Sequence, residues 1–331
     1  DYQNTISLNG YTFKHFRLSI QDTSLASAQP IWDKEKNQVM CYNGELYNTN
    51  YLKKKYLKGC PLLTTGDTEV VFKLIQKYGP EICKHFDGIF SIAFMDKDIL
   101  YLVRDHFGVK PLYFYHKSQK IIVSSEISII NYNTSRTLEL DNLPEFIAYK
   151  YNGNSSSIYK DVYKVAPGEI VKIGNKGIER RTKFFDIKKI ETCGPDVSKD
   201  EFKEDFERAV ISQKVSDVPY GLQLSGGVDS TLIAACFDAS TPSFSTVFGD
   251  NYSWDERQFV EQVANLFHFS PRYIQYDQLY AIRSIYGAMP FSGGINHPHT
   301  FAIEQLAQYA SREVKILFSG EGADELFWGY D

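Results

Sequence analysis

One stretch of seven residues combines glycines, hydroxyl side chains and a carboxylate: Ser225-Gly226-Gly227-Val228-Asp229-Ser230-Thr231. Adjacent glycines let a backbone approach an anion closely and point its N–H groups at it, and the hydroxyls add donors. Asp229 would repel a phosphate unless a cation lay between them, which favours Mg²⁺. The stretch follows the apolar segment 220–224 and precedes a predicted helix, as a phosphate-binding loop does. A plain strand-to-helix turn is the alternative.

A second stretch with carboxylates follows another predicted strand, Val314–Phe318. It reads Ser319-Gly320-Glu321-Gly322-Ala323-Asp324. Open α/β sheets bind ligands at the carboxyl ends of their parallel strands. We therefore expect Glu321 and Asp324 to lie near the phosphate-binding loop. A surface turn with solvated carboxylates is the alternative.

Together the two stretches resemble the asparagine synthetase family. The loop is similar to the pyrophosphate loop (PP-loop) of adenylate-forming enzymes and differs from the GxxxxGK[ST] and GxGxxG loops. Residues 319–330 resemble the family's SGEGxDExFxGY motif. The resemblance implies ATP and Mg²⁺, with proton transfer at Glu321 and metal contacts at Asp229 and Asp324. It assigns ATP or pyrophosphate contacts to Ser225, Gly226, Gly227, Asp229, Ser230, Thr231, Thr246, Ser319 and Gly320.

The first half of the chain carries residues suited to glutamine hydrolysis. That reaction passes through a tetrahedral oxyanion, which needs preorganised donors. Asn43 offers a side-chain amide and Gly44 a backbone N–H. Arg17 can pair with the α-carboxylate of glutamine, and Glu45 and Asp67 can receive its α-ammonium. For Asn43-Gly44 alone, a type I′ hairpin turn is the alternative.

These residues stand in segments that resemble the class II glutamine amidotransferase module. The segments are 17–22 (RLSIQD), 43–48 (NGELYN), 65–69 (TGDTE), 104–113 (RDHFGVKPLY) and 124–126 (SSE). We expect Arg104-Asp105 to form a structural ion pair. The family's nucleophile is a cysteine directly after the initiator methionine, and Cys41, Cys60, Cys83, Cys193 and Cys236 do not fit that role. We expect the nucleophile to lie outside this sequence, with loss of glutaminase activity as the alternative.

The pattern of elements divides the chain in two. Residues 1–185 are β-rich, with predicted strands at 39–42, 89–94, 99–103, 111–115 and 121–123 and a helix at 67–78. Residues 186–200 form a predicted linker. In 201–331 strands alternate with helices, which indicates a doubly wound parallel sheet. The resemblance implies an α+β N-terminal-nucleophile hydrolase sandwich, with antiparallel sheets between helices, followed by an α/β PP-loop domain. We expect both domains to be incomplete at the outer ends of the chain.

Composition limits which classes of partner the protein can have. The 331 residues carry a net charge of −5 and no dense basic stretch, which argues against nucleic acid. No apolar run is long enough to span a bilayer, so we expect no membrane partner. Five scattered cysteines favour reduced thiols in the cytoplasm. The remaining expected partners are glutamine and an acceptor carboxylate, and a homodimer is a further possibility.

The predicted activity is glutamine-dependent amide synthesis driven by adenylation of the acceptor. Aspartate is the family's default acceptor. Segment 290–300, with His297 and His299, occupies the place of the family's substrate loop but is unusual there. A sugar acid, a natural-product acid or lactam closure therefore remains an alternative. A tRNA-modifying adenylating enzyme and a catalytically inactive scaffold are the other candidates.

Overall fold

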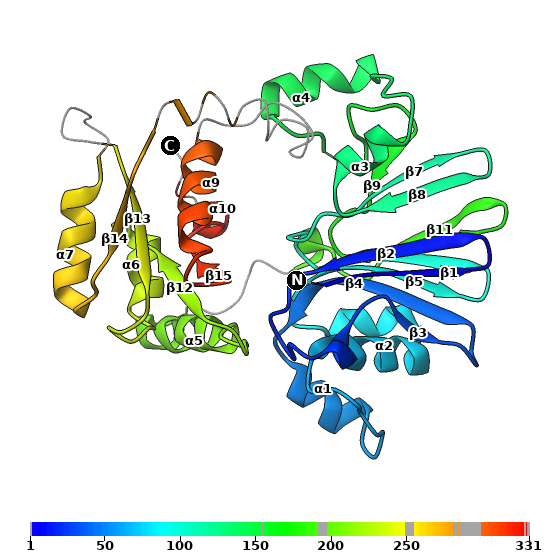
Figure 1. The fold of residues 1–331 in the computed structure, drawn as a ribbon, viewed down its shortest axis with the longest axis horizontal. Coiled ribbons are helices and arrows are strands. Elements are labelled where there is room, and N and C mark those ends of the chain that lie inside the picture. The colour runs from blue at the N-terminus through cyan, green and yellow to red at the C-terminus, as the bar shows by residue number, and fades with distance from the viewer. Residues whose placement is uncertain are drawn as a thin grey trace. The chain divides into compact units, whose positions relative to one another are not determined.

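The computed structural model describes residues 2–153, 155–190, 197–248, 255–277, 279–280, 282, 284, 299–327 and 329. The chain divides into two compact units, whose described residues lie within 2–190 and 197–329 (Figure 1). His297 and most of the segment 290–300 lie outside the described residues. No helix in the described part of the chain is long and apolar enough to cross a membrane.

A six-stranded antiparallel sheet forms the centre of the first unit. Its strand order is β11-β10-β6-β5-β4-β3. The strands are β3 (Ile31–Asp33), β4 (Gln38–Leu46), β5 (Gly88–Asp96), β6 (Ile99–Arg104), β10 (Glu169–Gly174) and β11 (Gly177–Lys183). The strands predicted at 89–94 and 99–103 are confirmed as parts of β5 and β6, which form a hairpin with Asp96 paired to Ile99 beside the turn.

Both faces of this sheet are buried. Helices α1 (Thr49–Tyr56) and α2 (Asp67–Tyr78) pack on one face through a cluster that includes Leu52, Leu74 and Phe94. On the other face lie β1 (Tyr2–Leu8) with β2 (Tyr11–Arg17), and a three-stranded sheet of β8 (Lys120–Ser124), β7 (Tyr113–Lys117) and β9 (Val162–Lys164). The continuous apolar pattern of β5 follows from this double burial.

A fourth layer completes the sandwich. Helix α3 (Ile127–Tyr132) packs on the three-stranded sheet through Ile127 and Ile130, and α4 (Leu143–Tyr149) follows along the chain (Figure 1). Among the described residues, four short 3₁₀ helices connect the elements: Leu25–Ser27, Pro80–His85, Leu140–Asn142 and Ile187–Lys189. Antiparallel sheets therefore lie between helices, as the predicted fold class requires.

The second unit is a parallel sheet with helices on both faces. Its strand order is β14-β13-β12-β15, with β12 (Tyr220–Gln223), β13 (Ser243–Val247), β14 (Arg272–Gln275) and β15 (Ile316–Phe318). Helices α5 (Lys199–Ser212), α6 (Val228–Ala234) and α7 (Arg257–Phe267) share one apolar cluster, and α9 (His299–Ala310) packs in another. Helix α10 (Ala323–Phe327) is the last described element. The doubly wound prediction is confirmed.

Candidate functional site

Arg17 is the last residue of β2, and its side chain is buried. The guanidinium donates to the carbonyl oxygens of Ser24 at 2.9 Å and Gln21 at 3.1 Å, and also to that of Asp22. These bonds shape the loop that follows β2. The loop in turn holds the guanidinium in place.

Asn43 and Gly44 lie inside β4, so the predicted turn at these residues is wrong. Asn43 pairs with Ser91 and Gly44 with Phe90 of β5, and neither residue has the positive φ that a type I′ turn needs. Pairing with a long buried neighbour overrides the local turn preference. A Cβ on Gly44 would lie 2.2 Å from the carbonyl oxygen of Ile89, which is why only glycine fits.

Two acidic side chains lie close to this part of β4, Glu45 within the strand and Asp67 at the start of α2. Gln21 donates from Nε2 to Glu45 Oε2 at 2.6 Å. Asp67, the first residue of α2, accepts at Oδ2 from the Tyr42 hydroxyl at 2.8 Å and from the Leu46 N–H at 2.9 Å. Each carboxylate is thus oriented by neighbours on a rigid strand or its adjoining loop.

The two carboxylates influence each other electrostatically. Burial, and then the charge of Asp67, raise the pKa of Glu45 to about 8. Burial also raises the pKa of Asp67. Near neutral pH the pair therefore retains a proton, and a cation placed beside it would favour full ionisation. This arrangement can receive an ammonium group.

The structure links two of the predicted glutamine residues, Arg17 and Glu45, through a third residue. Gln21 links them, since its carbonyl accepts from Arg17 and its side chain donates to Glu45. Sequence reasoning missed Gln21 and Tyr42. Both lie inside or directly beside recognised motifs, at 17–22 and 43–48, so their position next to motif residues was the available signal.

Three of the described cysteines are poor candidates for a nucleophile. Burial raises the pKa of Cys41 to about 12. Burial also raises the pKa of Cys83 and of Cys236. Because the thiolate is the attacking species, these thiols are unreactive near neutral pH. Cys193 lies outside the described residues.

The predicted ion pair of Arg104 with Asp105 is wrong. Arg104 donates to the carbonyl oxygens of Lys110 at 2.8 Å and Val165 at 2.9 Å. Asp105 accepts backbone N–H groups of Phe90, Phe107, Val109 and Lys110. Each side chain satisfies buried backbone groups around the 105–111 loop, which no ion pair could do. The segment is nonetheless structural.

The phosphate-loop motif connects β12 to α6. Gly226 has φ +78°, and a Cβ there would lie 2.6 Å from Phe259 Cβ on α7. Gly227 is the N-cap, so α6 begins within the seven-residue stretch and not after it, which places Asp229 in its first turn. An early start is favoured because an acidic residue in the first turn complements the helix dipole.

Hydroxyl groups of the motif bond within the loop. Ser225 and Ser230 Oγ atoms are 2.9 Å apart, and Thr231 Oγ1 donates to the Gly227 carbonyl at 2.7 Å. Ser230 is buried. These bonds preform the loop's shape.

The two motifs of the second unit meet at neighbouring strand ends. Strands β12 and β15 pair in parallel at Leu222↔Phe318. Directly afterwards, a Cβ on Gly320 would lie 3.0 Å from both Asp229 Cβ and Ser230 N. Thr246 is near the end of β13, which pairs with β12 on its other side (Figure 1). The carboxyl ends of three adjacent strands thus carry the predicted nucleotide residues.

The carboxylates near this edge differ in placement. Glu321 is exposed directly after Gly320, and Asp324 is half-buried in the first turn of α10. Within the described residues, no group of three or more His, Cys, Asp and Glu side chains could hold a metal by itself. Mg²⁺ at nucleotides needs only one or two protein carboxylates, because phosphates and waters complete its shell. Asp229 and Asp324 fit that limited role.

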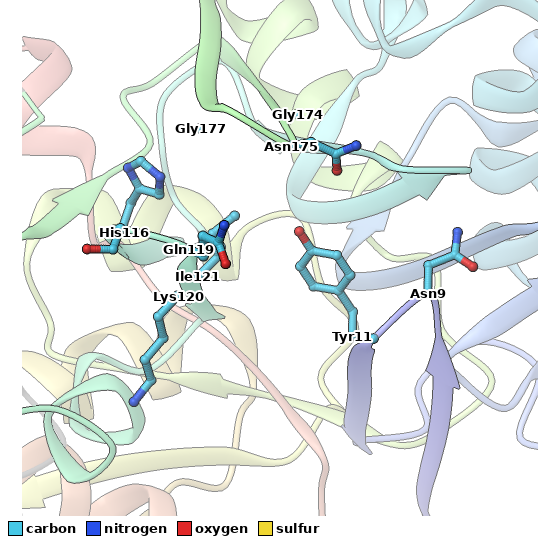
Figure 2. A pocket seen from close by; sticks show the side chains of 11 residues that line it. Asn9, Tyr11, His116, Gln119, Lys120, Ile121, Gly174, Asn175 and Gly177 are labelled. Carbon is cyan, nitrogen blue, oxygen red and sulfur yellow. The ribbon is translucent and has the colours of Figure 1, made fainter.

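A separate cavity of about 550 Å³ lies at the far end of β2 from Arg17. Three hairpin turns line it, those between β1 and β2, β7 and β8, and β10 and β11 (Figure 2). Its polar groups include the Tyr11 hydroxyl, the His116 imidazole and the amides of Gln119 and Asn175. None of the predicted site residues lines it.

Two family models match separate parts of the chain. The family model described as glutamine amidotransferase domain matches residues 1–185, and the one described as asparagine synthase matches residues 201–331. The protein is thus of the glutamine amidotransferase class. More narrowly, the chain belongs to the asparagine synthetase family.

Three curated relatives show the extent of similarity. Asparagine synthetase B of Escherichia coli is 28% identical over 100% of this chain and 59% of its own length. A putative asparagine synthetase of Methanocaldococcus jannaschii is 28% identical over 96% of this chain and 66% of its own length. The amidase chyE of Penicillium rubens is 26% identical over 96% of this chain and 51% of its own length. The chain therefore spans between half and two thirds of these relatives.

Proposed function

We propose that this protein makes an amide from an acceptor carboxylate, with ATP as the energy source and glutamine as the nitrogen donor. The observation that carries the proposal is the meeting of Gly320 with Asp229 and Ser230, which brings two distinct motifs to one sheet edge. The linked network of Arg17, Glu45 and Asp67 supports the glutamine half.

In the glutamine half, Arg17 binds the α-carboxylate and the Glu45–Asp67 pair binds the α-ammonium. A cysteine thiolate from outside this sequence attacks the amide carbon. The Asn43 side chain and the Gly44 N–H then stabilise the oxyanion. Collapse of the tetrahedral species releases ammonia, and water later frees glutamate. The raised pKa of Glu45 supports its role, since an ammonium ligand would stabilise the ionised pair.

In the synthetase half, the acceptor carboxylate attacks the α-phosphorus of ATP and pyrophosphate leaves. Backbone N–H groups of Gly226 and Gly227 bind the pyrophosphate, and Thr246 borders the adenine. Asp229 and Asp324 would hold Mg²⁺, which would neutralise charge on the phosphates of ATP. Ammonia then attacks the acyl carbon and displaces AMP, while Glu321 takes up a proton from the attacking nitrogen.

Aspartate is the first choice of acceptor. A different small carboxylic acid is the second candidate, because relatives called amidases match this chain nearly as well as those called asparagine synthetases. Lactam closure would use the same adenylation step but no ammonia. The unusual segment 290–300 supports keeping these alternatives.

The cytoplasm is the proposed compartment. Cys41, Cys60, Cys83 and Cys236 are free thiols. Thiols stay reduced in the cytosol, whereas secreted domains tend to pair theirs. Fractionation of cells expressing the full-length protein would test this placement.

Pyrophosphate release by the full-length protein tests the function. ATP, Mg²⁺ and either glutamine or ammonium are supplied with a panel of acids that includes aspartate, sugar acids and amino-acid-derived acids. We expect one acid to give pyrophosphate and AMP in equal amounts, together with an amide. Amide formation with ammonium but not glutamine would remove only the glutaminase half. No ATP turnover with any acid would refute the synthetase reading.

A further inference from the structure

His15 lies on β2, two residues before Arg17, with its ring half-buried. Side chains two apart on a strand point to the same face, so His15 and Arg17 share the inward face of β2. Its Nε2 atom is 3.2 Å from the carbonyl oxygen of Tyr42 on β4. The histidine therefore bridges the strand that carries Arg17 and the strand that carries Asn43 and Gly44.

The surroundings of His15 determine the protonation state and the tautomer of its ring. Burial lowers the pKa of His15, and although the bond to Tyr42 opposes that effect, the charge of Arg17 adds to it. The ring is thus neutral near pH 7, and one nitrogen carries the hydrogen. A carbonyl can only accept, so Nε2 must be the donor and Nδ1 a bare acceptor. Nδ1 is buried and has no hydrogen-bond partner among the described residues.

The Tyr42 carbonyl belongs to the peptide group that leads into Asn43. Other bonds hold the same residue, since its N–H donates to Gln29 Oε1 at 2.7 Å and its hydroxyl donates to Asp67 at 2.8 Å. His15 contacts the remaining polar group of Tyr42, its backbone carbonyl oxygen. Any tilt of this peptide would move the Asn43 and Gly44 donors that follow it.

We propose that His15 is a positioning residue for glutamine hydrolysis, which holds the Tyr42–Asn43 peptide so that the oxyanion donors of Asn43 and Gly44 are correctly aimed. The inference rests on the proposed glutaminase half-reaction. His15 touches neither the reacting atoms nor, in this role, the substrate. Its effect should therefore fall on the chemical step and not on glutamine affinity.

Two substitutions separate this role from simple packing. His15→Leu fills the space but removes the donor, whereas His15→Gln places an amide N–H near the former Nε2 position. For the full-length protein, His15→Leu should lower kcat for glutamine hydrolysis about 10-fold, the scale of one hydrogen bond, with KM changed less than about 2-fold. His15→Gln should recover most of the loss. Ammonia-dependent amide synthesis should be unchanged in both.

His116→Leu provides the matched control, because His116 is a half-buried histidine of the same unit that lines the hairpin cavity. It should leave glutamine hydrolysis at the wild-type rate. Equal kcat in wild type and His15→Leu would overturn the proposal, as would equal loss in the Leu and Gln variants. A wild-type protein without glutaminase activity would refute the proposed function instead.

Nitrogen-15 NMR of the ring tests the geometry without turnover. We expect a protonated Nε2 and a bare Nδ1 near neutral pH. In His15→Leu the Asn43 side-chain and Gly44 backbone amide signals should shift, and in His15→Gln they should stay near wild type. The opposite tautomer, an imidazolium, or unmoved Asn43 and Gly44 signals would each overturn the inference even if the enzyme were inactive.

Discussion

The surroundings of Glu45 oppose ionisation of its carboxyl group. It is held by Gln21 on one side and lies near buried Asp67 on the other. Without a cation the pair is costly to ionise fully, because two like charges share a poorly hydrated space. The pair therefore retains a proton near neutral pH, and the ammonium group of the proposed function would favour its release.

This arrangement predicts a pH-dependent stability. The folded pKa of Glu45, about 8, lies above its ordinary value of 4.5, so the folded state binds the proton more tightly than the unfolded chain. Stability contributed by this group is full below about pH 4.5 and is lost as pH rises through 8. Glu45→Gln should remove that loss and raise the unfolding free energy at pH 8.5 by about 1 kcal/mol or more.

Urea unfolding at pH 6 and 8.5 measures this effect. Glu35→Gln is a suitable control, since Glu35 is exposed. An equal pH dependence in wild type and Glu45→Gln would show that the carboxyl is not held protonated.

A second prediction concerns the carboxylate of Asp229. If it shares Mg²⁺ with the nucleotide, Asp229→Asn should lower the rate of pyrophosphate release at least about 100-fold, because the loss of an electrostatic contact of this kind costs about 3 kcal/mol. Asp238→Asn, which changes an exposed carboxylate after α6, should leave the rate unchanged. Unchanged release in Asp229→Asn would refute the metal role.

At the scale of elements, the sequence predicts periodic segments better than it predicts local exceptions. The helix Asp67–Tyr78 has the predicted bounds, and the strands predicted at 89–94 and 99–103 lie within β5 and β6. Asn43-Gly44 does not form a turn, because pairing with β5, which is remote in sequence, determines the backbone conformation there. The ion pair predicted between Arg104 and Asp105 is absent for the same reason, since the partners of both side chains are backbone groups brought near by the fold.

Gly44 tests how closely β4 and β5 approach. A Cβ would lie 2.2 Å from the Ile89 carbonyl oxygen and 2.7 Å from Phe90 Cα, and both are backbone atoms of a central strand that cannot move aside cheaply. Gly44→Ala should therefore destabilise the first unit by about 1–3 kcal/mol. Asn43→Ala, the exposed neighbour on the same strand, should change stability by less than about 0.5 kcal/mol. Similar unfolding midpoints for both variants would contradict the close approach.

For the whole molecule, the change from β-rich to alternating segments predicts two different architectures, and both are present. The network among functional residues is less accessible to prediction. Gln21 joins Arg17 to Glu45 only because the loop after β2 meets the end of β4. A motif marks which residues matter, but the bonds between motifs depend on loop conformations that no periodicity encodes.

The separate cores of the two units lead to a prediction about cooperativity. The clusters around Leu74 and Phe114 draw only on the first unit, and those around Leu222 and Phe244 only on the second. We expect residues 1–190, expressed alone, to unfold cooperatively within about 5 °C of the matching transition of the whole chain. Leu74→Ala should lower that transition in both samples, at a cost of about 2–5 kcal/mol. Leu222→Ala should lower only a second transition, seen by calorimetry of the whole chain. If Leu222→Ala destabilised both transitions equally, the two units would unfold as one, and the cores would not be independent.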